Sequence, residues 1–289
     1  TNRVSIQSSN LEVGSNDIIN SIGGNNTIIG GAGSDTITTT DGDDYIFGDN
    51  AEFTYYADGV LKKATTLAST NGGNDQVNAG SGSNTVIGGV GVDTVTTTGG
   101  DDYIFGDDAE FTYYADGVLS AARSLASSNG DDDNIDAGNG SNFIVGGVGI
   151  DTVTTTEGDD YIFGDDAEFT YYTDGVLKEA TTLASSNGGI DAINAGSGNN
   201  TIIGGVDADT ITATDGDDYI FGDDAELSYD ANGFLNKATT LASSNGGLDT
   251  INAGSGTNTV IGGVGADTIT TTDGADYIFG DDAEFTYYT

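Results

Sequence analysis

The stretch that decides the fold is Gly88–Thr96, which reads GGVGVDTVT and joins loop glycines, an aspartate and a short β-favouring segment. The pattern recurs every nine residues, so that Val77, Val86, Val95 and Ile104 occupy equivalent positions. An Asp or Asn stands two residues before each of them, and a Gly two residues earlier still. The spacing predicts tight glycine turns alternating with three-residue strands whose middle side chain points inward.

A longer repeat of 58 residues contains four of these nonapeptides and a 22-residue insert. Self-similarity at this period indicates a repeat architecture, in which each unit buries its apolar side against its neighbours. We expect one repeat domain over residues 1–289, with a strand-like segment at 1–13 and an incomplete last insert. Its modules lie at about 14–71, 72–129, 130–187, 188–245 and 246–289. The repeat is marked by Asp-Tyr-Ile-Phe-Gly-Asp, with its tyrosine at Tyr45, Tyr103, Tyr161, Tyr219 and Tyr277.

The nonapeptide fits the motif G-G-x-G-x-D-x-U-x, and on this motif the chain resembles the RTX (repeats-in-toxin, hemolysin-type calcium-binding) family. The resemblance covers the nonapeptides of all five modules. It implies an all-β fold, a calcium-stabilised parallel β-roll or β-solenoid, in which two nonapeptides make one turn. Each calcium ion would lie between the loops of successive turns. RTX proteins are typically exported, so the resemblance also implies an extracellular or cell-surface location.

Carried over residue by residue, the resemblance makes the Asp or Asn of each nonapeptide a candidate calcium ligand. It pairs Asp75 with Asp93 on one edge of the roll, and Asn84 with Asp102 on the other. Because Asn recurs at the second rung of every module, we expect the second edge to bind calcium more weakly. The candidate ligands are Asp17, Asn26, Asp35, Asp44, Asp75, Asn84, Asp93, Asp102, Asp133, Asn142, Asp151, Asp160, Asp191, Asn200, Asp209, Asp218, Asp249, Asn258, Asp267 and Asp276.

Three loops depart from the motif, because Ser15, Asp131 and Asp207 stand where a glycine is expected. Asp and Gly are also common in ordinary turns, so a purely structural role for them is an open alternative. Charge favours metal binding: 47 acidic and 6 basic residues give a net charge of −41, and such self-repulsion opposes compaction without counter-ions. We therefore expect multiple Ca2+ ions and folding that depends on them.

The same composition excludes other classes of partner and site. The chain has no His and no Cys, which excludes zinc or copper sites of the ordinary type. Its acidity disfavours nucleic acid and anionic membranes, and no apolar run approaches membrane-spanning length. Acidic pairs such as Asp43-Asp44 recur in the modules, which suits ligands or turns better than a general acid and base. We expect a protein that is not an enzyme and has no small-molecule substrate.

The insert is predicted to form a β-hairpin. Asp58-Gly59, Asp116-Gly117, Asp174-Gly175 and Asn232-Gly233 occupy one position in it, and such dipeptides are typical of two-residue type I′ turns. The flanking segments are rich in aromatic and β-branched residues. One wider coil of the same solenoid is the alternative.

Outward positions on the second and fourth rungs indicate where the insert lies. They are apolar, as at Ile87, Tyr103 and Phe105, and so long an exposed stripe is unusual in a soluble monomer. We expect Phe111 and Tyr113 of the insert to fold back onto this stripe as a second core layer. A neighbouring chain is the rival cover, and a carbohydrate-stacking or cofactor site is a less favoured use of the stripe.

The chain has 289 residues, against 290 for five modules. It ends at Tyr288-Thr289, in the first arm of an insert, and opens with Arg3–Gln7, a strand-like segment where a second arm would lie. We expect a homopolymer that assembles head to tail into an extracellular filament, sheath or matrix, with the missing arm supplied by the next copy. The alternatives are a stalk segment of a large RTX adhesin, or an ice-binding roll with outward threonines such as Thr94 and Thr96.

Overall fold

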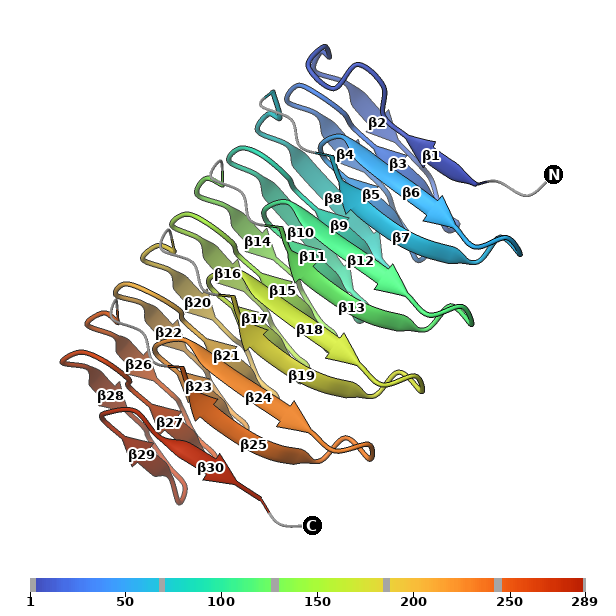
Figure 1. Ribbon diagram of the computed structural model, residues 1–289. Coiled ribbons are helices and arrows are strands. Elements are labelled where there is room, and N and C mark those ends of the chain that lie inside the picture. The colour runs from blue at the N-terminus through green and yellow to red at the C-terminus, as the bar shows by residue number, and fades with distance from the viewer. Residues whose placement is uncertain (1–3, 68–70, 126–129, 184–187, 242–245, 288–289) are drawn as a thin grey trace.

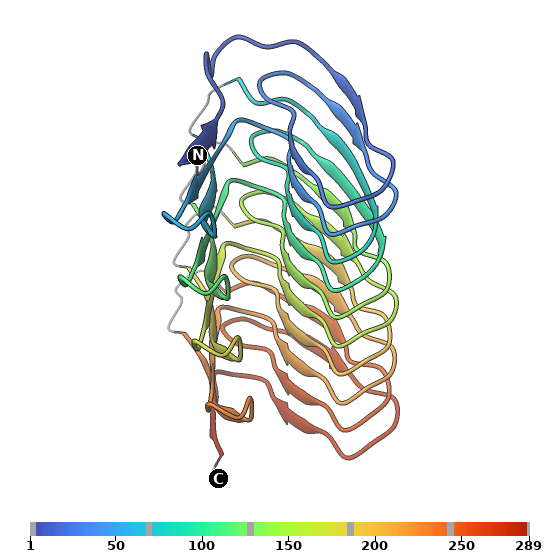
Figure 2. The ribbon, with the colours of Figure 1, turned by 90° about the vertical axis from the view of Figure 1, so that its right-hand side faces the viewer.

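The computed structural model describes residues 4–67, 71–125, 130–183, 188–241 and 246–287, and within these ranges every regular element is a β-strand. The strands form three ten-stranded sheets that run along the whole molecule (Figures 1 and 2). Two of them are parallel and form the roll, which confirms the predicted fold. Arg3, Tyr288 and Thr289 lie outside the described residues.

The first and third rungs of each module form one parallel sheet, here called sheet B. Neighbouring strands keep the nonapeptide in register, as in Val95 opposite Val77. Its outer face is polar and its inner face carries the ladder of Val and Ile residues. The strands of sheet B are β2 (Ile18–Asn20), β4 (Thr36–Thr38), β8 (Gln76–Ser81), β10 (Thr94–Gly99), β14 (Asn134–Asp136), β16 (Thr152–Thr154), β20 (Ala192–Asn194), β22 (Thr210–Thr212), β26 (Thr250–Asn252) and β28 (Thr268–Thr270).

The second and fourth rungs form the other parallel sheet, sheet C. Its inward residues, such as Val86 and Ile104, pack against Val77 and Val95 of sheet B, and all four are at most 1% exposed. These side chains are the inner core of the roll. The strands of sheet C are β3 (Thr27–Ile29), β5 (Tyr45–Phe47), β9 (Thr85–Ile87), β11 (Tyr103–Phe105), β15 (Phe143–Val145), β17 (Tyr161–Phe163), β21 (Thr201–Ile203), β23 (Tyr219–Phe221), β27 (Thr259–Ile261) and β29 (Tyr277–Phe279).

The inserts form antiparallel hairpins, as predicted, and these join edge to edge into sheet A. Each module adds two strands to every sheet, which is a rise of about 9.6 Å at the usual strand spacing. One two-stranded hairpin per module therefore spans the same rise, and consecutive hairpins form a continuous sheet. The strands of sheet A are β1 (Ser5–Gln7), β6 (Ala51–Tyr55), β7 (Leu61–Thr66), β12 (Ala109–Tyr113), β13 (Leu119–Ser124), β18 (Ala167–Tyr171), β19 (Leu177–Thr182), β24 (Ala225–Tyr229), β25 (Leu235–Thr240) and β30 (Glu284–Thr286).

Sheet A covers the apolar outer face of sheet C and builds a second core layer. Phe105 of β11 and Phe111 of β12 lie edge to face, with ring centroids 5.4 Å apart, and both are at most 1% exposed. Ile87 is fully buried in the same cluster. The predicted role of the insert as a cover for the apolar stripe is confirmed.

The predicted type I′ turn is wrong. Tyr56 N–H donates to the carbonyl of Val60, and Gly59 N–H donates back to the carbonyl of Tyr56, which encloses a three-residue loop. Gly59 has a φ of 97°, whereas Asp58 is not among the residues with positive φ. Instead the Asp58 carboxylate accepts the N–H of Val60 at 3.1 Å, a local bond that holds a type I turn followed by a left-handed glycine.

Candidate metal centre

The first edge of the roll carries a continuous ladder of aspartates. The backbone N–H of each donates to Oδ1 of the next, at 2.6–3.1 Å. Successive members are 18 or 40 residues apart, because every second turn contains the insert. The predicted neighbours Asp75 and Asp93 are adjacent in it, at 2.7 Å. The ladder joins Asp17, Asp35, Asp75, Asp93, Asp133, Asp151, Asp191, Asp209, Asp249 and Asp267.

The second edge carries a similar ladder in which Asn and Asp alternate, with N···Oδ1 distances of 2.7–3.1 Å. Asn84 precedes Asp102, as predicted, and its side-chain Nδ2 donates to the carbonyl of Gly82 at 2.9 Å. This amide therefore satisfies a loop carbonyl without a metal ion. The ladder joins Asn26, Asp44, Asn84, Asp102, Asn142, Asp160, Asn200, Asp218, Asn258 and Asp276.

In all but Asp17 and Asp276, the two end members, the second carboxylate oxygen of the ladder aspartates is buried and, in the described part of the chain, has no hydrogen-bond partner. A buried carboxylate oxygen without a donor is strongly unfavourable, so a cation is the natural counterpart of each. These unpaired atoms are Oδ2 of Asp35, Asp44, Asp75, Asp93, Asp102, Asp133, Asp151, Asp160, Asp191, Asp209, Asp218, Asp249 and Asp267.

A glycine leaves room for each of these oxygens on the first edge. A Cβ built on Gly88 would lie 2.4 Å from Oδ2 of Asp93 and 2.4 Å from the carbonyl oxygen of Gly106. Gly48 faces Oδ2 of Asp75 in the same way, at 2.2 Å. The first loop glycine is thus required because a carboxylate and a carbonyl oxygen meet where its side chain would be.

The donor set fits a hard, oxygen-preferring cation. Carboxylate and carbonyl oxygens are the ligands that Ca2+ takes in flexible geometry. In the ranges that the structure covers, no three acidic side chains converge tightly enough to hold an ion by themselves, so backbone carbonyls must complete each site. A bound Ca2+ would supply positive charge to the unpaired oxygens and link successive turns.

Comparison with known protein families matches the RTX calcium-binding nonapeptide repeat over residues 22–51, 69–104, 87–109, 127–153, 145–167, 185–220 and 252–283, more than half of the chain. The chain belongs to the RTX calcium-binding family. RTX nonapeptide repeats bind multiple Ca2+ ions, and the family is generally structural and typically secreted. A search of curated proteins finds no match. In the described ranges, the RTX chain has no helix of the length and apolarity needed to span a membrane.

Burial raises the pKa of many of the RTX ladder aspartates, and the largest shifts lie on the first edge. The pKa of Asp93 rises to about 9 and that of Asp133 to about 10, through burial and the nearby carboxylates. On the second edge burial raises the pKa of Asp102 and Asp160 only to about 6. Without cations, ionising the carboxylates of the first edge therefore costs more free energy than ionising those of the second. This agrees with the expectation that the first edge binds calcium more tightly.

A third row of acids at the base of the inserts was missed by the sequence analysis. Oδ2 of Asp49 and of Asp107 accepts the N–H of Val90 and of Val148, at 2.7 and 2.6 Å. Their Oδ1 atoms are buried without a described partner, and burial raises their pKa values to about 8 and 9. The signal was present, because these residues close the Asp-Tyr-Ile-Phe-Gly-Asp repeat. The row continues as Asp165 and Asp223.

The departures from the motif leave the first ladder unbroken. Asp207 adopts a φ of 69°, the left-handed conformation that a loop glycine would take. The Asp191–Asp209 and Asp209–Asp249 bonds beside it are both 2.8 Å. The loops that contain Ser15 and Asp131 likewise keep their ladder bonds, at 2.7 Å.

Proposed function

We propose that this RTX chain is a secreted, non-catalytic structural rod, made rigid by calcium, that assembles head to tail into an extracellular filament, sheath or matrix. The observation that carries the assembly is the register of β1. Ile6 lies opposite Phe53, and Ala64 of β7 lies opposite Phe111, one module of 58 residues further along. The segment β1 therefore occupies the place of a second insert arm.

The other end of sheet A offers the matching edge. β30 pairs with β25 through Ala238 and Phe285, and no described strand pairs with its other side. In a complete hairpin, the phenylalanine at the position of Phe285 pairs with an alanine of the second arm, as Phe53 pairs with Ala64. Ile6 of a second copy fits this position opposite Phe285, because β1 takes the place of a second arm and, among the described strands, pairs with β6 alone, which leaves its other edge for β30 of the neighbouring copy.

The end coils of the roll also expose apolar side chains. Ile19, the inward residue of the first coil, is only partly buried at one end, and Tyr277 and Ile278 are 62% and 49% exposed at the other. The interior equivalent of Ile278, Ile104, is fully buried. Stacking one rod on the next would bury both end coils and continue both aspartate ladders across the junction.

Secretion is supported by the chemistry of the sites. Sites built from a few carboxylates and many carbonyls suit the millimolar calcium of an extracellular medium. The family is typically secreted, and extracellular calcium would keep the rod folded only after export.

Electron microscopy and sedimentation of the calcium-loaded chain test the assembly. The intact chain should form filaments, whereas a variant lacking residues 1–7 should give folded monomers. Ile6→Asp, which places a charge against the partner's Phe285, should also block filaments, while Ser5→Asp on the opposite face should not. Filaments from the deletion variant would contradict strand donation.

A stalk segment of a larger RTX adhesin is the second candidate, because the same exposed end coils would be covered by further modules of one chain. Folded, calcium-loaded monomers from the intact chain would favour it. Ice binding is less favoured: Thr96 and Thr154 lie on alternate strands of sheet B, with Asn78 and Asp136 beside them in register.

A further inference from the structure

One outward row of sheet C alternates tyrosine with threonine. β5, β9 and β11 place Tyr45, Thr85 and Tyr103 in adjacent register positions. The next threonine place along the sheet holds a different residue, because β11, β15 and β17 align Tyr103, Phe143 and Tyr161. The repeat thus contains one position where a ring replaces the threonine.

Phe143 shows what fits between two of these tyrosines. Its ring stacks on Tyr103 with centroids 4.8 Å apart and planes 10° apart, and on Tyr161 at 4.9 Å and 1°. Sheet A closes the place with Phe169 at 5.2 Å and Tyr171 at 6.2 Å, both at steep angles. A flat six-membered ring is therefore accommodated between two parallel tyrosine faces, beside two further rings.

The residues 58 positions earlier enclose a cavity in place of that ring. Tyr45, Tyr103, Phe111 and Tyr113 are the counterparts of the four rings around Phe143, and with Thr85 they line a cavity of about 250 Å3. Tyr45 and Tyr113 are joined by a hydroxyl–hydroxyl bond of 3.0 Å. Since Thr85 lacks a ring, the cavity is the place that Phe143 fills in the next module.

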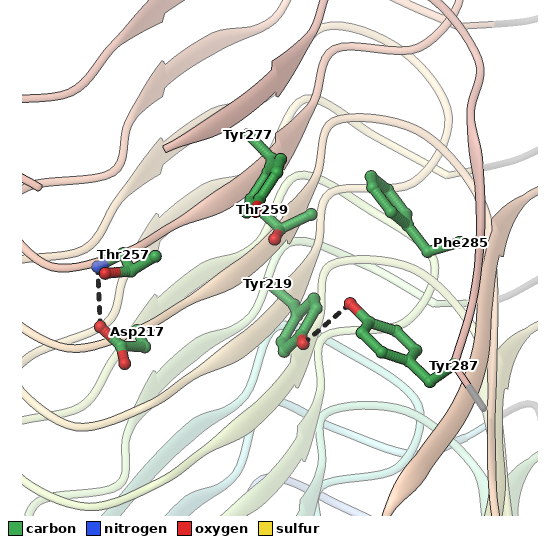
Figure 3. Close-up of a pocket in the computed structure, with 7 residues that line it drawn as sticks. All are labelled: Asp217, Tyr219, Thr257, Thr259, Tyr277, Phe285 and Tyr287. Atoms are coloured by element: carbon green, nitrogen blue, oxygen red, sulfur yellow. Dashed lines mark hydrogen bonds between the residues drawn. The ribbon is translucent and has the colours of Figure 1, made fainter. Parts of the chain in front are cut away.

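The same cavity recurs three modules along the chain. Tyr219 and Tyr277 lie on either side of Thr259, while Phe285 and Tyr287 face them from sheet A (Figure 3). The cavity has a volume of about 360 Å3. Tyr219 and Tyr287 repeat the hydroxyl–hydroxyl bond at 3.0 Å. Two separated cavities with one set of rings indicate a repeated slot.

A carboxylate lines each slot, from a different place in the repeat. Asp101, two residues before Tyr103, lines the first, and Asp217, two residues before Tyr219, lines the second. Oδ1 of Asp101 accepts the N–H of Ser141 at 2.9 Å, and Oδ1 of Asp217 accepts that of Thr257 at 2.7 Å. The tyrosine faces carry negative quadrupole charge, and the chain has a net charge of −41. The lining carboxylate, the tyrosine faces and the net charge of the chain all favour a cation as the occupant of a slot.

We propose that the slots at Thr85 and Thr259 bind a flat organic cation, held between two tyrosine faces with its charge toward Asp101 or Asp217. The planar guanidinium of an arginine side chain and aromatic amidines belong to this class. Thr201 lies between Tyr161 and Tyr219 in the same register, so it is included with Thr85 and Thr259 in the variants that test the slots.

Calorimetric titration of the calcium-saturated chain with benzamidinium tests the proposal. This probe joins a ring like that of Phe143 to a planar cation. It should bind with a Kd of about 1 mM or tighter, on the scale of a small efficient ligand. Neutral benzamide and methyl glucoside should bind at least about tenfold more weakly, because they lack the attraction of a cation to the rings.

Substitutions in the slots identify where benzamidinium binds. Thr85→Phe/Thr201→Phe/Thr259→Phe fills every slot with the ring that the chain already tolerates, and should reduce benzamidinium binding at least about tenfold. Phe143→Thr opens a new slot and should raise the stoichiometry by a further site, a result that does not depend on the triple variant folding. Undiminished binding in a folded triple variant, equal binding of benzamide, or an unchanged stoichiometry in Phe143→Thr would each overturn the proposal.

Discussion

The backbone N–H of Asp93 donates to Oδ1 of Asp133 at 2.7 Å, while Oδ2 of Asp133 is buried with no donor in the described chain. One oxygen of the carboxylate therefore holds two turns of the roll together, and the other is left for a cation. Because this relationship repeats along the first edge, metal binding and the stacking of the turns are coupled.

Replacing a ladder Asp by Asn should stabilise the calcium-free chain and weaken calcium binding, and replacing a ladder Asn by Asp should do the opposite. Asp93→Asn supplies an amide that can donate to its own loop carbonyl, as Asn84 does to Gly82. It should stabilise the calcium-free chain by about 1–3 kcal/mol, because a buried oxygen is no longer unsatisfied, and weaken calcium binding. Calcium titrations followed by circular dichroism, together with urea unfolding in saturating calcium, measure both effects.

The reciprocal variant is the control. Asn84→Asp removes the donor to Gly82 and creates an unpaired oxygen on the second edge. It should lower the stability of the calcium-free chain by a similar amount and increase the stabilisation that calcium provides. Two variants that shift stability in the same direction would show that the Oδ2 atoms do not face the ion sites.

Raising the pH should lower the free energy of unfolding of the calcium-free chain and raise that of the calcium-loaded chain. Burial raises the pKa of Asp93 from an ordinary value near 3.8 to about 9, so the native state keeps a proton that the unfolded chain releases. Between about pH 4 and pH 9 the free energy of unfolding in chelator should therefore fall as the pH rises.

With saturating calcium the carboxylates are ionised ligands and protons compete with the metal, so stability should rise with pH over the same window. Circular dichroism in chelator, which reports the folded fraction, and thermal melts in calcium, each at a series of pH values, measure the two slopes. Slopes of the same sign in both media would mean that these buried carboxylates do not exchange protons for calcium.

The second core layer can be tested at neighbouring residues of β6. Phe53 is 1% exposed and lies edge to face with Phe47 at 5.1 Å. Phe53→Ala should cost about 3–5 kcal/mol of unfolding free energy in calcium, whereas Thr54→Ala, on the other face of the strand, should stay within about 0.5 kcal/mol. Equal losses in chemical denaturation would mean that sheet A is not packed as described.

Periodicity predicted the rungs, the inward residues and both ladders, because a nine-residue repeat fixes which side chains stack. It also predicted the hairpin and its apolar contacts at Phe111. The turn type was missed because the Asp58 side chain bonds to Val60 and stabilises a three-residue loop, which composition alone does not distinguish from a type I′ turn.

The continuous sheet A and the third acidic row were harder to foresee. Pairing of Ala64 with Phe111 joins consecutive inserts and depends on the rise of the roll matching two strand spacings. The role of Asp49 depends on Val90, which lies 41 residues away and comes beside it only when the turns stack. Neither relationship is contained in a local motif.

Circular dichroism of the purified chain in excess chelator, followed by addition of millimolar calcium, tests the central claim most directly. We predict loss of the β spectrum in chelator and its cooperative return with calcium, because the buried carboxylates of both ladders then gain their counter-ions. Magnesium at the same concentration should restore little, since it demands octahedral geometry and dehydrates reluctantly. A spectrum and a thermal midpoint that are the same in chelator and in calcium would contradict the account.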